Sequence, residues 1–457
     1  MKTLIIALLF FCQLGYAQYK SDTAFINYVQ PSVFSLSMVM MHDVVNPPAA
    51  TRFYSYAMLT AYQIVAMHNK EVPNAKTFIK SFPFITISDT IGEYDYRVAA
   101  VYAILEAGKQ LLPSGFMLTQ DEGKLVQLFK KDKVPDSIIA HSVAVATEVA
   151  AQIVKWSKGD GYGKLSTRLR YTPQKEEGYW YPTPPAYMDA VEPHWRTIRP
   201  MVIDSCNQYP ALDPVPFSKD TGSAFYKLNM EVYTAGLNLQ KEQEHLNIAS
   251  FWDCNPFAVT TYGHMAIGFK KITPGGHWMN VSGIAARKAN LNFDNTILVH
   301  AISAITMMDA FIACWDTKFK TNRIRPETYI NKYMDVKWKP LLQTPPFPEY
   351  VSGHSIVSTA GATVLTYLFG DNFAYSDNSE EMFEIPARSF TSFNQASQEA
   401  AISRLYGGIH YRDAIDNGVT QGRQLAEGVI IKLKAAGIKP VYSEKKDSRQ
   451  AFQEKIQ

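Results

Sequence analysis

The 457-residue sequence has little charge and almost no excess of either sign. Asp, Glu, Lys and Arg make up 19% of the residues, and the formal net charge is +3. A protein that binds nucleic acid through its phosphates needs a pronounced basic excess, so the composition argues against that class of partner. It leaves room for a locally basic pocket.

Cysteines are also scarce. Apart from Cys12 in the N-terminal apolar run, the chain has only Cys206, Cys254 and Cys314. Three thiols cannot all pair, so at most one disulfide forms among them. They show no C-x-x-C spacing, which argues against a thiolate metal site, and we expect buried apolar thiols.

We find no apolar run of membrane-spanning length, and the longest near the N-terminus has the features of a signal peptide. Lys2 precedes an apolar run from Leu4 to Cys12, and Gly15-Tyr16-Ala17 is a small-x-small cleavage site. The run is too short to cross a bilayer. We therefore expect residues 1–17 to be removed near Ala17, and the mature chain to be exported to the periplasm or secreted, with no membrane span.

What the chain does have is helical periodicity, with 47% hydrophobic residues. Residues 18–30 are predicted to form an extended lead-in, and no convincing strand pattern is present. The fold class is therefore predicted to be all-α. Helices are expected at 31–70 with a kink at Asn46-Pro47-Pro48, at 97–112, 119–130, 134–157, 221–235, 238–253 and 283–316, and beginning near Ser352, Thr391 and Arg412.

Composition also suggests a division of the chain. Residues 158–220 are rich in Gly, Tyr and Pro and too aromatic for a flexible linker, so we expect a connection lying over apolar surface at the rim of a site. We expect an N-terminal helical half at 18–240, a C-terminal half at 241–440 and a polar tail at 441–457.

Three short clusters between residues 315 and 416 carry the chemistry. The first is Lys318 followed after six residues by Arg325, which precedes a proline and should be extended at a helix end. Two such cations can hold one anion from different sides, with paired donors from the arginine. The alternative is a solvated basic helix face, because Lys320 and Arg323 lie between them.

The second cluster is Ser352-Gly353-His354-Ser355. Ser352 is a plausible helix N-cap, which would leave the Gly353 amide at a helix N-terminus where an anion is favoured. His354 beside it can act as a general acid or base. The alternative is an ordinary capping turn.

The third cluster runs from Ser403-Arg404 to His410. Gly407-Gly408 should break the helix and let Arg404 and His410 converge. A neutral His410 near the start of the next helix could serve as a nucleophile or a ligand. The alternative is a glycine-rich turn with an exposed histidine.

The order of these clusters resembles the superfamily that contains vanadium-dependent haloperoxidases and the type-2 phosphatidic-acid and bacterial acid phosphatases. The pattern is Lys318-x6-Arg325-Pro326, then Ser352-Gly353-His354, then Ser403-Arg404-x5-His410. The flanking residues 315–318 and 347–351, and the N-terminal residues 42–47, are similar to secreted bacterial haloperoxidases of the iodide-using branch.

The resemblance implies vanadate as cofactor, in a fold of two packed four-helix-bundle-like halves with the oxyanion site at helix termini of the C-terminal one. Lys318, Arg325 and Arg404 would neutralise the vanadate oxygens. Ser352 and the Gly353 amide would hydrogen-bond to them.

The same resemblance assigns roles to the two histidines. His410 would bind vanadium and His354 would be the acid–base residue. Lys318 would polarise hydrogen peroxide, which a halide then attacks to give hypohalous acid. The vanadium would act as a Lewis acid. In the sister phosphatases the same His410 would attack phosphorus and form a phosphohistidine, so a secreted acid phosphatase is the alternative function.

Two aromatic residues favour the peroxidase. Trp315 and Phe347 stand where haloperoxidases have aromatic residues near the halide, although ordinary core packing would also explain them. The chain is also longer than a minimal acid phosphatase and lacks the membrane helices of the lipid-phosphate enzymes. We therefore expect a secreted haloperoxidase that oxidises iodide, with bromide as the second candidate.

The chain departs from the family pattern near His410. An aspartate four residues after this histidine usually orients it, but Ala414 stands there. Asp413, Asp416 or a backbone carbonyl are the candidate replacements. Val351 also takes the place of a usual proline.

Two further expectations concern aspartates and histidines that are not part of the three clusters. Asp309 or Asp316 is expected to pair with one of the arginines at 323, 325 and 404. His264 and His277 are expected in loops that approach the site.

Overall fold

The computed structural model describes residues 22–239, 241–262 and 265–443. Within them it contains thirteen α-helices and two short antiparallel hairpins, so the prediction of an all-α fold is confirmed. The hairpins pair β1 (Ala258–Tyr262) with β2 (Met265–Phe269) and β3 (Tyr375–Asp377) with β4 (Arg388–Phe390). The predicted signal peptide and most of the polar tail lie outside the described residues.

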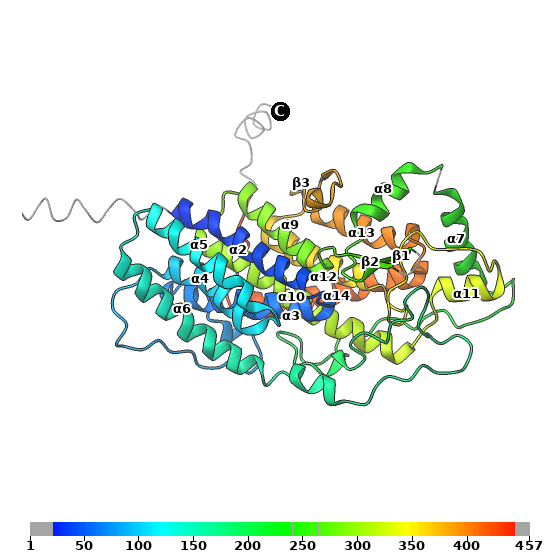
Figure 1. The fold of residues 1–457 in the computed structure, drawn as a ribbon, viewed down its shortest axis with the longest axis horizontal. Coiled ribbons are helices and arrows are strands. Elements are labelled where there is room, and N and C mark those ends of the chain that lie inside the picture. Colours follow the sequence, from blue (N-terminus) through cyan, green and yellow to red (C-terminus); the bar gives the residue numbers. More distant parts are fainter. Residues whose placement is uncertain (1–21, 240, 263–264, 444–457) are drawn as a thin grey trace, which may run out of the picture.

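The N-terminal helices gather at one end of the molecule (Figure 1). The predicted kink at Asn46 is a boundary between two helices, because the Asn46 side chain accepts a hydrogen bond from the Ala49 amide and two prolines begin the next helix. The predicted extended lead-in is wrong from Asp22 onward, where a helix begins. The five helices are α2 (Asp22–His42), α3 (Pro47–His68), α4 (Tyr96–Leu111), α5 (Leu118–Lys131) and α6 (Asp136–Ser157).

The long helix α10 (Phe293–Thr321) is central, because it packs against both α3 and α12 (Gly353–Phe369). A single helix at 283–316 was predicted, and this is wrong. α9 (Pro274–Lys288) ends before it, Asn290 adopts a positive φ of 49°, and the Asn292 side chain caps α10. These two asparagines end one helix and begin the next.

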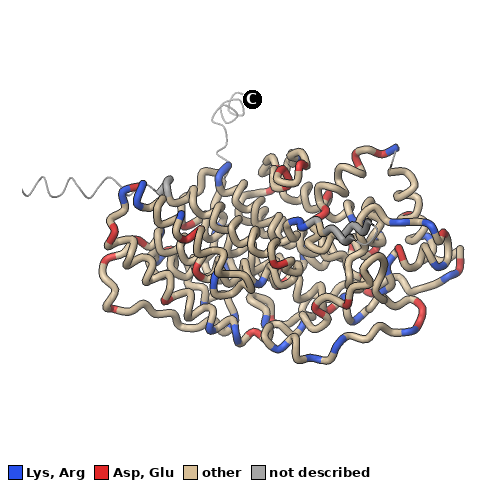
Figure 2. The backbone as a smooth tube through the Cα atoms, viewed as in Figure 1, with Lys and Arg blue, Asp and Glu red and all other residues tan. Residues whose placement is uncertain are grey.

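Two stretches, Asp136–Thr167 and Phe293–Thr321, are long and apolar enough to cross a membrane by length and composition. The apolar window of the second is wholly buried inside the protein, as expected for the core helix of a folded domain. Charged residues lie mainly on the outer loops and helix ends, and the central helices carry few of them (Figure 2).

The remaining helices frame the other end of the molecule (Figure 1). α12 packs against both α13 and α14, and α13 packs against α8. The helix α11, just after Arg325, was not predicted. The bounds are α7 (Ala224–Asn238), α8 (Gln243–Phe251), α11 (Pro326–Tyr333), α13 (Phe393–Tyr406) and α14 (Arg412–Ala435).

The connection at 158–223 has only two short 3-10 helices, at Tyr162–Thr167 and Trp195–Thr197. It is no flexible linker, because Trp180 and Trp195 are buried. The Trp180 amide donates to the Asn322 carbonyl at 2.8 Å, which attaches the connection to the end of α10.

Candidate oxyanion site

Helix termini bring the three sequence clusters together. Lys318 lies in the last turn of α10, and Arg325 is extended at the start of α11, as predicted. Ser352 caps α12, accepting a 3.2 Å hydrogen bond from the Ser355 amide, so Gly353 is the first residue of that helix. α13 ends before the glycine pair, and Gly408 has a φ of 76°, which a residue with a side chain rarely adopts. The predicted capping and helix break are both confirmed.

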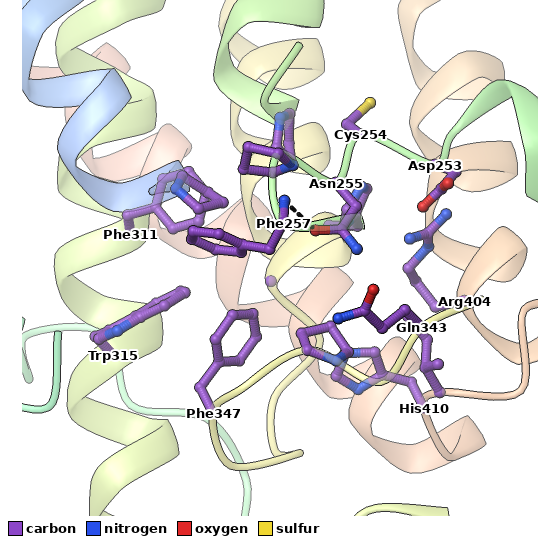
Figure 3. A pocket seen from close by; sticks show the side chains of 17 residues that line it. Asp253, Cys254, Asn255, Phe257, Phe311, Trp315, Gln343, Phe347, Arg404 and His410 are labelled. Atoms are coloured by element: carbon purple, nitrogen blue, oxygen red, sulfur yellow. Dashed lines mark hydrogen bonds between the residues drawn. The ribbon is translucent and has the colours of Figure 1, made fainter. Parts of the chain in front are cut away.

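A cavity of about 40 Å³ lies where these termini meet. Figure 3 shows aromatic rings on one side and basic side chains on the other. The aromatic side consists of Phe257, Phe311, Trp315 and Phe347, and the basic side of His354, Arg404 and His410.

The rings of Trp315 and Phe347 are in contact, with centroids 4.9 Å apart. Trp315 is held by α10 and by a 3.1 Å hydrogen bond from its indole N–H to the Val191 carbonyl. Both side chains are buried, at 1% and 8% exposure, yet both line the cavity. They therefore form a fixed apolar wall of a small polar cavity.

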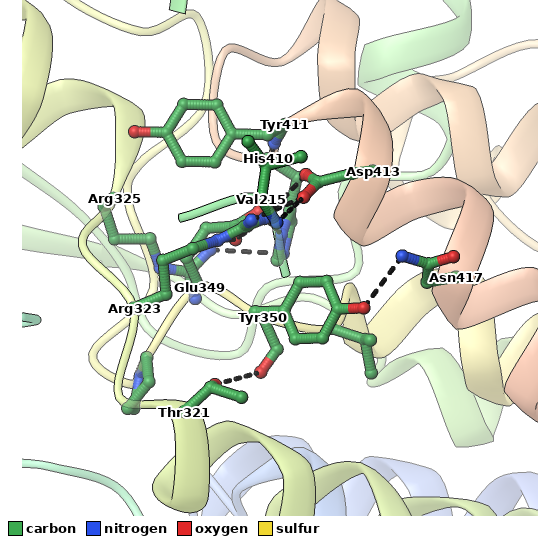
Figure 4. Close-up of polar contacts among 12 residues, drawn as sticks. Val215, Thr321, Arg323, Arg325, Glu349, Tyr350, His410, Tyr411, Asp413 and Asn417 are labelled. Carbon is green, nitrogen blue, oxygen red and sulfur yellow. Dashed lines mark hydrogen bonds and ion pairs between the residues drawn. The ribbon is translucent and has the colours of Figure 1, made fainter. Parts of the chain in front are cut away.

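His410 is oriented by Glu349, a residue that the sequence analysis missed (Figure 4). The Oε1 atom of Glu349 lies 2.8 Å from His410 Nδ1 and also accepts from the Tyr411 amide at 3.0 Å. The Glu349 carboxylate can only accept a hydrogen bond, so Nδ1 of His410 carries the proton and Nε2 keeps its lone pair. Burial, with Arg325 and Lys318 nearby, lowers the pKa of His410 well below its usual range, which favours the neutral ring.

Glu349 is itself held by Arg323, which donates to its Oε2 at 2.7 Å. Arg323 also forms a two-point contact with Asp413, at 2.6 and 2.8 Å. Neither Asp413 nor Asp416 orients His410, so that prediction is wrong. Asp413 instead holds Arg323, which in turn holds Glu349, the residue in contact with His410.

The expectation for Asp309 and Asp316 is also wrong. Asp309 accepts the amides of residues 201–203 at 2.7–2.9 Å, and Asp316 pairs with Arg196 at 3.3 Å. Both carboxylates thus fasten the long connection to α10. His277 lies not in an approach loop but fully buried in α9. His264 lies outside the described residues.

Lys318 is fully buried behind the cavity and does not line it. Its Nζ donates to the carbonyls of Pro348, Glu349 and Val351 at 2.9, 3.0 and 2.6 Å. It thereby shapes the segment that leads to Ser352. Burial, assisted by Arg325, lowers the pKa of Lys318 to about 7.

Arg404 and His354 are positioned by the main chain at Trp252. Arg404 donates from Nη2 to the Trp252 carbonyl at 2.7 Å and from Nε to the Ser403 hydroxyl at 2.9 Å. The imidazole of His354 forms a hydrogen bond with the backbone of Trp252. Burial together with Arg404 lowers the pKa of His354 well below the usual range. The segment after α8 therefore contributes to the site, which no sequence motif indicated.

Buried atoms without partners show that the site suits an oxyanion. Arg325 donates from Nε to the Phe347 carbonyl and from Nη1 to the Ile409 carbonyl and His410 Nε2, but its Nη2 has no partner. The Nε2 of His354 also lacks one. Arg325 and Arg404 are buried without a direct carboxylate contact among the described residues. A multiply charged oxyanion would satisfy these donors and offset their charge, so the residues fit vanadate.

Comparison with known proteins supports this interpretation. Residues 298–436 match the family model of the VCPO second helical-bundle domain. The chain is similar to the solved structure of a bacterial vanadium-dependent iodoperoxidase, at 41% identity, with a TM-score of 0.84 over 92% of this chain and 98% of that one. No curated protein sequence matches it.

Two structures of a bacterial vanadium-dependent chloroperoxidase share the fold. The holo form is 13% identical, with a TM-score of 0.63 over 86% of this chain and 93% of that one. The apo form is 15% identical, with a TM-score of 0.60 over 84% of this chain and 94% of that one.

Proposed function

The chain belongs to the vanadium-dependent haloperoxidases, with vanadate as cofactor, and from this premise we propose that it oxidises iodide with hydrogen peroxide to hypoiodous acid. The observation that carries the proposal is the two-sided cavity, with two histidines and an arginine opposite an aromatic wall. The aromatic rings face the basic side chains across the cavity, an arrangement that offers a halide an apolar surface beside an inorganic oxyanion.

His410 is the proposed vanadium ligand. Its Nδ1 proton is fixed on Glu349, so the lone pair of Nε2 is available on the other side of the ring. In this structure Arg325 Nη1 donates to that nitrogen at 3.1 Å, so ligation requires the guanidinium to move onto an oxyanion oxygen.

The proposed oxyanion donors are Arg325, Arg404, Ser352 and the Gly353 amide. The two guanidiniums offset the negative charge, and the amide at the start of α12 adds a dipole of the right sign. The cofactor, when bound, supplies Lewis-acid activation of peroxide without a change of oxidation state.

His354 is proposed to transfer protons, and Lys318 is proposed to adjust the charge beside the site. His354 is neutral and has a free Nε2 at the cavity, so it can accept a proton from incoming hydrogen peroxide and return one to a leaving oxygen. With its pKa near 7, Lys318 can change charge near neutral pH. Its direct action on peroxide would require it to give up one of its three carbonyl contacts.

Iodide is proposed as the halide because the wall of Trp315 and Phe347 is apolar. A large, weakly hydrated anion loses less on leaving water for such a surface than a small one does. The neighbouring cations still attract its charge, since Lys318 Nζ lies 5.1 Å from the centre of the Phe347 ring.

The experiment is iodide oxidation by purified protein after vanadium is removed by a chelator and restored as orthovanadate. Peroxide-dependent formation of triiodide should appear only after restoration. Hydrolysis of p-nitrophenyl phosphate by the vanadium-free protein, in the absence of any peroxidase activity after loading, would overturn the proposal and favour a phosphatase.

We also propose that the protein is exported, on the pattern of Lys2, the apolar run from Leu4 to Cys12 and Gly15-Tyr16-Ala17. N-terminal sequencing of the protein from the periplasm or the medium should then begin near Gln18. Recovery of the full-length chain in the cytoplasm alone would contradict export.

A further inference from the structure

A second cluster of ionisable side chains lies directly behind the cavity. Cys254 follows α8, His277 is in the first turn of α9, and Asp377 and Glu380 lie at and just after the end of β3. All four are buried, with exposures of 2% for Cys254 and 0% for the others. Three segments that are remote in sequence therefore place a thiol, an imidazole and two carboxylates together in the core.

The distances are those of atoms arranged around one centre. His277 Nδ1 lies 3.5 Å from Cys254 Sγ and 3.0 Å from Glu380 Oε1, and the three ligand atoms all lie within 4.8 Å of one another. Bonds of about 2.3 Å to sulfur and about 2.1 Å to nitrogen place those two atoms roughly 3.6 Å apart around a tetrahedral zinc ion. The thiol and the imidazole already have this spacing.

The Glu380 carboxylate points to a missing partner. Neither of its oxygens has a hydrogen-bond partner, although both are buried. Its Oε1 is close to His277 Nδ1 but not in hydrogen-bond geometry with it. A buried carboxylate without hydrogen bonds is costly unless a cation binds it. An atom placed between Glu380, His277 and Cys254 would explain all three positions.

The other side of His277 has the arrangement expected of a metal-bound histidine. Its Nε2 lies 2.8 Å from Asp377 Oδ2, and Asp377 Oδ1 accepts from the Ser379 amide at 3.0 Å. With a metal ion bound, the Asp377 carboxylate would keep the proton on Nε2, and the lone pair of Nδ1 would then be directed at the ion between the thiol and Glu380.

We propose that Cys254, His277 and Glu380 bind a zinc(II) ion. Thiolate, imidazole and carboxylate are together the donors that this borderline-soft dication takes, whereas calcium and magnesium take oxygen alone. Neither Glu380 oxygen has a hydrogen-bond partner, so bidentate binding by this side chain would supply a fourth donor atom. Two negative ligands and a neutral imidazole balance the charge of the ion in the core.

The ion would fix a segment that the oxyanion site depends on. The indole of Trp252 stacks on His277, with centroids 4.6 Å apart, and the Trp252 carbonyl holds Arg404. Cys254 is among the residues that line the cavity, and Figure 3 shows its sulfur directed away from the basic residues. Loss of zinc should therefore also weaken vanadate binding, and only this consequence rests on the proposed function.

The test uses full-length protein purified without a metal-binding tag and kept free of vanadium. Elemental analysis should find about one zinc per chain, and replacement with cobalt(II) should give a thiolate-to-cobalt charge-transfer absorption. The variants Cys254→Ser and Glu380→Gln should lose most of the zinc, and Cys254→Ser should lose the charge-transfer band. Cys206→Ser, a change at a half-buried thiol elsewhere, is the matched control and should keep both.

Thermal unfolding provides a check that does not need the variants. Removal of zinc by a chelator should lower the Tm of wild type and of Cys206→Ser, and added zinc should restore it. Folded wild-type protein that takes up neither zinc nor cobalt, or equal zinc in wild type and Glu380→Gln, would overturn the proposal. A zinc-loaded protein without haloperoxidase activity would instead contradict only the proposed function.

Discussion

His410 Nδ1 lies 2.8 Å from Glu349 Oε1, and this contact determines which ring nitrogen is free for a ligand. The two residues are 61 positions apart in the chain. The same carboxylate is fastened by Arg323, so the histidine is held by a side chain that is itself fixed. Glu349 thus takes the place of the aspartate that is absent at Ala414, whose carbonyl instead accepts from the Ser352 amide at 3.0 Å.

The first prediction concerns this orientation. Glu349→Gln should weaken vanadate binding by about 10- to 100-fold, the usual effect of removing a partner that orients a metal ligand. The Kd comes from restoring activity with increasing orthovanadate. Asp413→Asn is the matched control, because it removes a charge from the same Arg323 without touching His410. Equal losses in both variants would show that the charge network matters and the histidine contact does not.

The second prediction concerns the aromatic wall. Phe347→Leu should raise the KM for iodide roughly fivefold with the vanadate Kd unchanged, because losing part of an apolar contact costs about 1 kcal/mol. Phe369→Leu makes the same truncation in a buried phenylalanine that does not line the cavity. A similar KM in both variants would contradict a halide role for Phe347.

The third prediction concerns the cap of α12. Ser352→Ala should lower the free energy of unfolding by about 1 kcal/mol and weaken vanadate binding roughly tenfold, because the hydroxyl caps the helix and is the proposed donor to the anion. Ser392→Ala removes an equivalent cap from α13, where Ser392 accepts from the Gln395 amide at 3.0 Å. Ser392→Ala should lower the free energy of unfolding and leave the vanadate Kd unchanged. If it also weakened vanadate binding, the weaker binding in Ser352→Ala would be due to loss of helix stability.

The fourth prediction concerns pH and Asp309. Burial outweighs three amide hydrogen bonds and raises the pKa of Asp309 from 3.8 to about 6. Between these values the folded state holds more protons than the unfolded state, so the free energy of unfolding falls as pH rises. The contribution, on the order of 3 kcal/mol, is complete below about pH 4 and lost above about pH 6.

Urea unfolding of the vanadium-free protein between pH 4 and pH 7 measures this contribution. Asp309→Asn cannot titrate at this position. The free energy of unfolding of wild type minus that of the variant should therefore fall as pH rises. A difference that is constant across this range would mean that Asp309 has an ordinary pKa in the folded protein.

Local patterns in the sequence predicted much of the fold and of the site. The Ser352 cap, the extended Arg325 before Pro326 and the break at Gly407-Gly408 each depend on neighbouring residues, and each is present. The gap between α9 and α10 was missed because apolar residues flank it on both sides. The sequence does contain the signal for this gap, because asparagine commonly ends and begins helices, as Asn290 and Asn292 do here.

What the sequence could not predict are contacts between remote segments. Nothing in the spacing links Glu349 to His410, or Trp252 to Arg404, because helix packing brings them together. The absence of a C-x-x-C pair argues against a thiolate metal site, yet Cys254 and Glu380, which are 126 positions apart, lie together with His277. Spacing rules detect only those sites whose ligands are close in sequence.

The most direct test is a titration of vanadium-free protein with orthovanadate in which bound vanadium and peroxide-dependent iodide oxidation are measured together. Both should rise in parallel and level off at one vanadium per chain. His410→Ala should show neither the tight binding nor the activity. Iodide oxidation that precedes vanadium binding, or His410→Ala protein that binds vanadium as tightly as wild type, would contradict a vanadate-dependent haloperoxidase with His410 as its ligand.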